Sequence, residues 1–300
     1  MNTKKILKND RVCKALTGLR VSEFEDLLPM FESCLIAQRY KIKPNRKRKI
    51  GGGKKGVLAT TADKLAYIVL YLKVYPTYDV MGFLTNRVRS KCCESVQFLL
   101  PVLEITLGRK QVLPKRKITS VNEFIELFPE FKDVFIDGTE RPVQKPKNIK
   151  KRNKLYSGKK KTHTRKTIII SDDKNRILAM ILTKSGRRHD KRLFDKSQMS
   201  SSIPKKVSIC TDTGFIGIQH THSNTIMPTK ATKNSPLTDS QKQTNRAISS
   251  IRILSEHAIG GIKRLKSASD IYRNRLPNLD DTFTLLAAGL WNLHLQKITT

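Results

Sequence analysis

The feature that most constrains the fold is a change of pattern near residue 110. Before it, apolar residues recur with helical spacing. After the segment RKQVLPKRKITS they gather in short runs rich in β-branched residues, each closed by turn-forming residues. The second and third runs meet at DDKNR, which predicts a hairpin. The expected strands are 133–140, 164–173, 176–186 and 205–215, and the expected later helices are 189–198, 238–266 and 278–296.

Strands followed by helices, with a central hairpin, are typical of an α/β (α+β) domain in which helices flank a mixed sheet. A chain of 300 residues is long enough for two domains. We therefore expect a helical region over residues 1–110 and a sheet-containing region over residues 111–300.

The helical region contains a helix-turn-helix pattern over about residues 61–107. One helix begins at Thr61 and is stopped by Pro76, and two more follow with a break near residues 85–87. The helix from about residue 88 would then meet DNA with its N-terminal end. An ordinary three-helix bundle with a solvated basic end has the same pattern. The residues expected to contact DNA are Arg87, Arg89 and Lys91.

The charge of the chain indicates a polyanionic partner. Lys and Arg number 59 and Asp and Glu number 25, which gives a net charge of +34. Such an excess repels itself in the folded state, and double-stranded DNA would relieve it. No apolar run approaches the roughly 20 residues that a membrane span requires, and the first residues lack a signal-peptide core. We expect a cytoplasmic, nucleoid-associated protein. The basic, glycine-rich segment 41–56 is interpreted as a linker or a phosphate-contacting loop.

Two expected strands end in an acid, which strand propensity does not favour. Asp137 follows Val-Phe-Ile in FIDGT, and Asp212 follows Ser-Ile-Cys-Thr in SICTDTGF. A third acid, Asp190 in SGRRHDKRLF, opens a helix after the third strand. Each has an ordinary alternative, because Asp137 and Asp212 can form Asx turns and Asp190 can be a helix N-cap.

Together, in so basic a chain, these acids predict metal-dependent phosphoryl transfer. Two carboxylates about 4 Å apart repel each other by about 1 to 4 kcal/mol, so a cluster of acids needs cations. Two divalent ions about 3.5 to 4 Å apart can activate a water or a 3′-hydroxyl and stabilise the leaving oxygen of a phosphodiester. Oxygen ligands such as Asp137, Asp212 and Glu256 suit Mg²⁺ or Mn²⁺.

Glu256 is the one acid in the basic stretch SSIRILSEHAIGGIKRLKS. At helical spacing Arg252, four residues before it, and Lys263, seven after it, share its face. The ordinary alternative is a surface ion pair between Arg252 and Glu256, which contributes only about 0.3 to 0.5 kcal/mol in a helix.

The segment 144–166 has no acid and eleven basic residues. A solvated charge run is the ordinary interpretation. Because the segment directly follows a strand that ends in an acid, we favour a groove for the DNA backbone, with Tyr156 stacking on an unpaired base. The expected contacts include Lys159, Lys160 and Lys161.

Five motifs, FIDGTE, YSGKKKTHT, SGRRHDKRLF, TDTGF and RILSEHAIGGIK, resemble those of insertion-sequence transposases of the DDE superfamily, in the bacterial branch similar to Harbinger transposases. They stand in the same order as in that family. The resemblance runs from about Thr61 to His294. It implies a ribonuclease-H-like sheet preceded by a helix-turn-helix domain.

By position, the resemblance implies that Asp137, Asp212 and Glu256 are the three catalytic, metal-binding acids. The family's C-terminal signature is Tyr, two residues, Arg, three residues, Glu, six residues, Lys. Arg252, Glu256 and Lys263 fit it as a metal ligand flanked by DNA contacts, while Ser249 stands where the Tyr belongs. Asp190 resembles a metal-site residue of relatives without being one of the three defining acids.

The function expected from these observations is that of a transposase that hydrolyses DNA at the element's ends and transfers strands to target DNA. The cofactors expected are two Mg²⁺ or Mn²⁺ ions. The partners expected are terminal inverted repeats, target DNA and further copies of the chain. The alternatives are a catalytically inactive DNA-binding protein or repressor derived from a transposase, and a stand-alone nuclease of the same fold.

Overall fold

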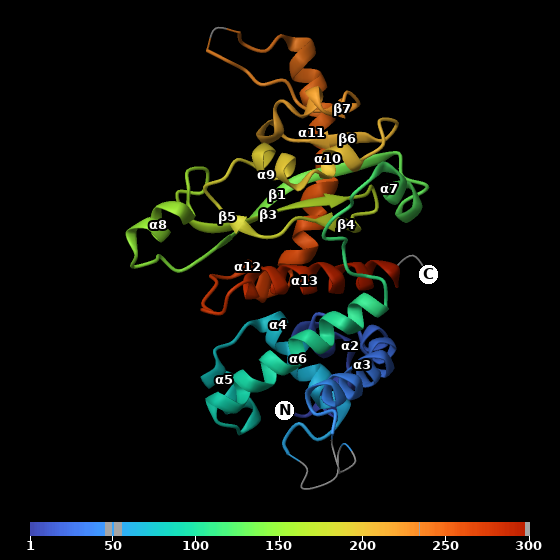
Figure 1. Cartoon of the computed structure of the whole chain (residues 1–300), viewed down its shortest axis with the longest axis vertical. Coiled ribbons are helices and arrows are strands. Elements are labelled where there is room, and N and C mark those ends of the chain that lie inside the picture. Colours follow the sequence, from blue (N-terminus) through green and yellow to red (C-terminus); the bar gives the residue numbers. More distant parts are fainter. Residues whose placement is uncertain (46–49, 51–55, 234, 298–300) are drawn as a thin grey trace. The chain divides into compact units, whose positions relative to one another are not determined.

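The computed structural model describes residues 1–45, 50, 56–233 and 235–297 (Figure 1). The chain forms two compact units, each assembled from separate stretches of sequence. The helical unit comprises residues 1–113, 262–270 and 282–300, and the sheet unit comprises residues 114–261 and 271–281. No helix among the described residues is both long and apolar enough to cross a membrane.

The helical unit is built around a central helix, α4. Every residue of this helix from Leu65 to Leu72 is buried, as expected for a helix surrounded by others. Thr60 and Asp63 form a capping box at its start. The described helices of this unit in the first part of the chain are α1 (Thr3–Leu7), α2 (Asp10–Thr17), α3 (Val21–Ile42), α4 (Thr61–Val74), α5 (Tyr78–Thr85) and α6 (Arg89–Arg109).

The three helices α4, α5 and α6 confirm the predicted succession of helix, helix, short break and helix. The break is tight, because the Arg87 N–H donates to the Gly82 carbonyl at 2.9 Å and Asn86 has a φ of 48°. A Cβ on Gly82 would lie 2.5 Å from the Arg87 carbonyl oxygen, so only glycine fits there. The segment predicted as a linker, 41–56, lies largely outside the described residues, and its first two residues belong to α3.

Two C-terminal stretches complete the helical unit: α12 (Lys266–Ser269) and most of α13 (Leu279–Gln296). The His294 ring nitrogen Nδ1 lies 2.6 Å from the Glu23 carboxylate, and both side chains are buried. The Asn292 amide donates to the Val112 carbonyl at 2.8 Å. The compact units therefore differ from the predicted division at residue 110, because α13 packs with helices that precede it by nearly the whole chain.

The sheet unit is a mixed sheet in the order β2-β3-β1-β6-β7, with β4 and β5 also pairing with β3. β1 pairs with β3 antiparallel and with β6 parallel. The turn at DDKNR joins β3 to β4 as an antiparallel hairpin, which confirms that prediction. The strands are β1 (Asp133–Pro142), β2 (Tyr156–Ser157), β3 (Thr162–Ser171), β4 (Ile177–Met180), β5 (Lys184–Ser185), β6 (Ser208–Thr211) and β7 (Thr225–Ile226).

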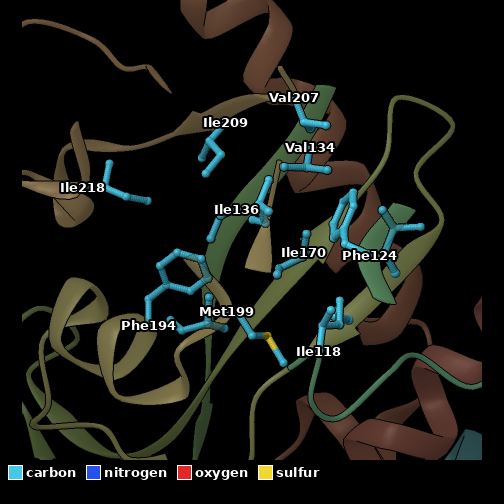
Figure 2. Close-up of a cluster of buried hydrophobic side chains, with 14 of the residues drawn as sticks. Ile118, Phe124, Val134, Ile136, Ile170, Phe194, Met199, Val207, Ile209 and Ile218 are labelled. Carbon is cyan, nitrogen blue, oxygen red and sulfur yellow. The ribbon is translucent and has the colours of Figure 1, made fainter. Parts of the chain in front are cut away.

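Helices cover both faces of this sheet, as the strand-then-helix order predicts. Figure 2 shows Val134 and Ile136 of β1, Ile170 of β3 and Ile209 of β6 converging with Phe194 in one buried cluster. The helical elements of the unit are α7 (Val121–Leu127), α8 (Ile149–Leu155), α9 (Asp190–Ser197), α10 (Met199–Ser202), the short turns η1 (Thr213–Phe215) and η2 (Ile218–His220), and α11 (Asp239–Lys263) up to residue 261.

The opposite face of the sheet carries the acids. Side chains alternate along a strand, so Asp137 shares a face with Phe135, and Asp212 shares a face with Cys210, away from the cluster of Val134, Ile136 and Ile209. In Figure 1 α11 crosses these strands, and the charge of its Arg252 acts on both Asp137 and Cys210. The face that bears the acids is therefore the one that α11 covers.

Candidate active site

Asp137 and Asp212 each follow the last residue of the parallel pairing between β1 and β6. β6 ends just before Asp212, as predicted, but β1 continues past Asp137 to Pro142 because its later residues pair with β3, so the prediction that this strand ends in the acid is wrong. The last pair in the register of β1 and β6 is Ile136 with Thr211, and each acid is the next residue along its strand. The Thr211 hydroxyl donates to the Ile136 carbonyl at 3.0 Å and fixes this register. Because neighbouring strands lie about 4.8 Å apart, the sheet brings the two carboxylates within reach of one ion.

Each of these acids is oriented by the backbone that follows it. The Gly138 N–H donates to Oδ1 of Asp137 at 2.6 Å, and the Gly214 N–H donates to Oδ1 of Asp212 at 2.8 Å. Asp212 is the N-cap of η1. The Asx-type turn that we named as the ordinary alternative for Asp212 is therefore formed, and it uses Oδ1 of that carboxylate.

The two carboxylates repel each other. Burial raises the pKa of Asp137 from 3.8 to about 6, and the charge of Asp212 adds to this rise. The hydrogen bond from Gly138 and the positive charges of Arg252 and Lys159 oppose it. These positive charges do not cancel the rise in the pKa of Asp137, and a divalent cation would favour the ionised form further.

Part of the basic segment 144–166 approaches Asp212. β2 and β3 form a tight hairpin in which Tyr156 pairs with His163 and packs edge-on against its ring, 5.6 Å between centroids. The turn of this hairpin places Nζ of Lys159 3.8 Å from Oδ2 of Asp212. Lys160 and Lys161 are exposed beside it.

A cleft of about 1160 Å³ lies at these residues and includes Lys159, Asp190 and Asp212 in its lining. A second cavity of about 570 Å³ shares Asn153, Arg187, Arg188 and His189 with it, so the two are continuous. The basic residues that line the second cavity, which we call the basic groove, are Lys150, Lys154, Arg187, Arg188, Arg192 and Lys196. The sequence interpretation missed the four on and before α9, although the run RRHDKR was a visible signal.

Asp190, the first residue of α9, lines the cleft and is only 8% exposed. His189, not Asp190, is the N-cap residue, so the alternative that Asp190 caps this helix is wrong. Oδ1 of Asp190 lies 2.9 Å from the buried Lys166 ammonium. Burial alone would lower the pKa of Lys166, but Asp190 and Glu140 outweigh it and raise that pKa above its ordinary value.

Glu256 is exposed on α11, one turn after the half-buried Arg252. Within the part of the chain that the structure describes, these two side chains form no ion pair with each other, so the surface-pair alternative is not realised. The described residues also contain no group of three or more acids, histidines or cysteines close enough to hold a metal ion. The fold therefore places Asp137 next to Asp212, whereas Glu256 lies apart from them. Lys263 is in the last turn of α11.

The expected DNA contacts of the helical unit lie at the start of α6. Arg87 precedes this helix and donates to Ser95 Oγ at 2.9 Å, with its guanidinium above the Tyr67 ring. Arg89 and Lys91 are exposed, and their partners are the exposed Asp79 at 4.0 Å and Glu94 at 2.9 Å. Arg89 and Lys91 are thus free to exchange these partners for phosphates, whereas Arg87 is held within the unit.

Residues 136–292 match a family model described as a DDE superfamily endonuclease. This chain belongs to that family. The match spans the strands that carry Asp137 and Asp212 and the whole of α11. The protein is also 30% identical over 285 residues to a probable transposase for insertion sequence element IS702 from Microchaete diplosiphon, with 95% of each chain covered. No solved structure matches. The mixed sheet flanked by helices is consistent with the ribonuclease-H-like fold of DDE proteins, as we expected.

DDE superfamily endonucleases generally use divalent metal ions. In this member two adjacent carboxylates, with the pKa of one raised by burial and by the other's charge, fit a hard cation between Asp137 and Asp212. The donor set is oxygen only, which suits Mg²⁺ or Mn²⁺ and not zinc.

Proposed function

We propose that this DDE superfamily protein is the transposase of an insertion sequence, which cuts DNA at the ends of its element and joins the freed 3′-hydroxyls to target DNA. The observation that carries this proposal is that Asp137 and Asp212 each follow the last paired residues of two adjacent parallel strands, and that Asp212 lines a cleft together with basic residues such as Lys159 and Arg188. The similarity to a probable transposase over 95% of both chains supports the same activity.

Asp137 and Asp212 are proposed as catalytic residues that hold Mg²⁺ or Mn²⁺, with Glu256 as the third acid. A divalent ion held there supplies positive charge at the reacting phosphodiester, which carboxylates alone cannot provide. Glu256 lies one turn beyond Arg252, whose charge already acts on Asp137. A rotamer change or a small shift of α11 on metal binding is therefore required to bring Glu256 to the pair.

The cations around the acids are proposed to bind the DNA backbone. Lys159 at the rim of the cleft exchanges Asp212 for a phosphate, and Lys160 and Lys161 extend the contact along the strand. Tyr156, 42% exposed and lining the cleft, is placed to stack on a base that is unpaired at the cut. Arg252 and Lys263 contact phosphate from α11. The basic groove then holds the backbone on one side of the scissile phosphate.

Residues before about Gln111 are proposed to recognise the terminal inverted repeats through Arg89 and Lys91 at the start of α6. The chain is proposed to act as a homo-oligomer, because an element has two ends to be cut and joined, and to associate with the nucleoid.

The experiment that tests the function is Mg²⁺-dependent nicking of a duplex that carries the element's own end. Asp137→Asn and Asp212→Asn should each lower the cleavage rate by several orders of magnitude while duplex binding persists, since both acids serve one site. The matched control is Asp133→Asn, an exposed acid at the opposite end of the same strand β1. A wild-type protein that binds ends without cutting them would instead be a repressor, and one that cuts any duplex without joining strands would be a stand-alone nuclease.

A further inference from the structure

Three charged side chains are buried together beneath the proposed active site. Lys166 of β3 and Glu140 of β1 are directly opposite each other in the antiparallel register, and Nζ of Lys166 lies 3.2 Å from Oε1 of Glu140. The same ammonium lies 2.9 Å from Oδ1 of Asp190 and donates to the Arg188 carbonyl at 3.0 Å. Lys166 thus donates to one backbone carbonyl and forms ion pairs with two buried carboxylates.

The second oxygen of Glu140 is also occupied, because the Thr164 hydroxyl donates to Oε2 at 2.5 Å. The side chains of Lys166, Glu140 and Asp190 are only 6%, 4% and 10% exposed. A buried cation between two buried carboxylates is costly to separate, because removing one partner leaves an uncompensated charge out of water. Nothing in the proposed reaction so far uses this group.

The Asp190 carboxylate touches the backbone that follows both catalytic acids. A Cβ on Gly138 would lie 3.0 Å from Asp190 Oδ1, and a Cβ on Gly214 would lie 3.1 Å from Oδ2. Gly138 directly follows Asp137, and Gly214 donates its N–H to Asp212. The carboxylate therefore fits between these two glycines because neither carries a side chain.

We propose that Lys166 and Asp190 are positioning residues for the cleavage reaction: the Lys166 ammonium holds the Asp190 carboxylate between Gly138 and Gly214, which fixes the Asp137 and Asp212 carboxylates side by side for metal binding. In this arrangement Asp190 acts by position and not as a metal ligand, because the Lys166 ammonium already neutralises its carboxylate. The proposal rests on the proposed function of Asp137 and Asp212.

Asp190→Asn separates this role from that of a ligand. The amide keeps the size that fits between the glycines and keeps an oxygen for Lys166, but it removes the charge that a metal ligand needs. We expect the Mn²⁺ dissociation constant of the DNA-free protein, measured by calorimetry, to rise less than about threefold in Asp190→Asn. In Asp137→Asn it should rise at least about tenfold. The cleavage rate of Asp190→Asn should fall about 10- to 100-fold at unchanged affinity for DNA, as for residues that orient metal ligands.

A second pair of variants tests Lys166. Lys166→Met leaves Glu140 and Asp190 as two buried carboxylates without a cation, and the protein should unfold at a lower temperature or fail to fold. Adding Asp190→Asn removes one of the two charges and should restore folding, so the two substitutions are strongly non-additive. The double variant should bind Mn²⁺ more weakly than Asp190→Asn, because no ammonium then holds the side chain in place.

Two results would overturn the proposal. If Asp190→Asn loses Mn²⁺ affinity as fully as Asp137→Asn, then Asp190 is a ligand. If Asp190→Asn and the double variant cleave and bind Mn²⁺ like wild type, the buried group serves stability alone. If the proposed function is wrong, the wild-type protein will neither bind Mn²⁺ at the site nor nick DNA. That result differs from both results that would overturn the positioning role.

Discussion

Nζ of Lys159 lies 3.8 Å from Oδ2 of Asp212, so a proposed DNA contact and a proposed metal ligand neutralise each other in the metal-free protein. The lysine side chain is 65% exposed and the aspartate 16%, which means that the ammonium can leave while the carboxylate stays. A metal ion should therefore compete with Lys159 for the Asp212 carboxylate, and a DNA phosphate should compete with Asp212 for the Lys159 ammonium.

Lys159→Gln is expected to have opposite effects on the two ligands. Without the competing ammonium, Mn²⁺ should bind the DNA-free protein a few-fold more tightly, because an exposed ion pair contributes only about 0.2 to 1 kcal/mol. Affinity for duplex DNA should fall. Calorimetry with Mn²⁺ and a DNA-binding titration measure the two effects, and Lys160→Gln is the control that should weaken DNA binding without changing Mn²⁺ affinity. A loss of Mn²⁺ affinity in Lys159→Gln would contradict the expectation.

Glu256→Gln should abolish cleavage without harming the fold. The substitution keeps size and helix propensity but removes the charge of the third proposed acid, so Mg²⁺-dependent nicking should fall by orders of magnitude while DNA binding persists or tightens. Asp239→Asn at the start of the same helix is the matched control, since Asp239 is an exposed acid that forms an ion pair with the exposed Lys242. Nicking at the wild-type rate by Glu256→Gln would show that Glu256 is an ordinary surface residue.

The raised pKa of Asp137 predicts a pH dependence with a definite sign. Between its ordinary pKa of 3.8 and its folded pKa of about 6, the folded metal-free protein holds a proton that the unfolded chain has lost. This group therefore makes the metal-free protein less stable as the pH rises from about 4 to about 6. Metal binding requires the ionised acid, so Mn²⁺ affinity should fall about tenfold per pH unit below about 6.

Urea unfolding at several pH values measures the stability of the metal-free protein, and the added stability with Mn²⁺ present measures the change in Mn²⁺ affinity. In Asp137→Asn the pH dependence of stability over this range should flatten, because the amide does not titrate. Equal Mn²⁺ affinity of the wild type at pH 5 and pH 7 would contradict the assignment of Asp137 as a ligand.

The basic groove should contribute to the salt dependence of DNA binding. Each phosphate contact makes the slope of log affinity against log salt more negative by about 0.9. Arg192→Gln together with Lys196→Gln removes two such contacts and should make the slope shallower by about 1.8. The matched control is Lys132→Gln with Lys206→Gln, which removes the same formal charge at the amino ends of β1 and β6, away from the acids. Equal changes in the two double variants would mean that only net charge matters.

Arg89→Gln should weaken the preference of the full-length protein for its own terminal repeat over random duplex by about tenfold or more, since a specific arginine contact to a base contributes about 1 to 3 kcal/mol. Competition binding with the two duplexes measures this ratio. Arg109→Gln, at the other end of α6, should leave the ratio unchanged. If both variants kept the preference, the assignment of α6 as the recognition helix would be wrong.

The sequence by itself determined the local elements and the positions of the acids. The hairpin at DDKNR, the end of β6 just before Asp212, and the helices of the predicted helix-turn-helix all follow from residue spacing and turn chemistry, which act over a few residues. The continuation of β1 past Asp137 to Pro142 was not predicted, because those residues pair with β3, a partner that spacing along the chain does not specify.

Only the tertiary structure decided which distant residues meet. His294 contacts Glu23 across 271 positions, and so α13 belongs to the helical unit. Lys166 is one of eleven basic residues in its segment by sequence, but it is the one buried between Glu140 and Asp190. Neither relationship has a local signal, because each depends on which faces of separate elements pack together, and that is set by burial of the whole core and not by spacing along the chain.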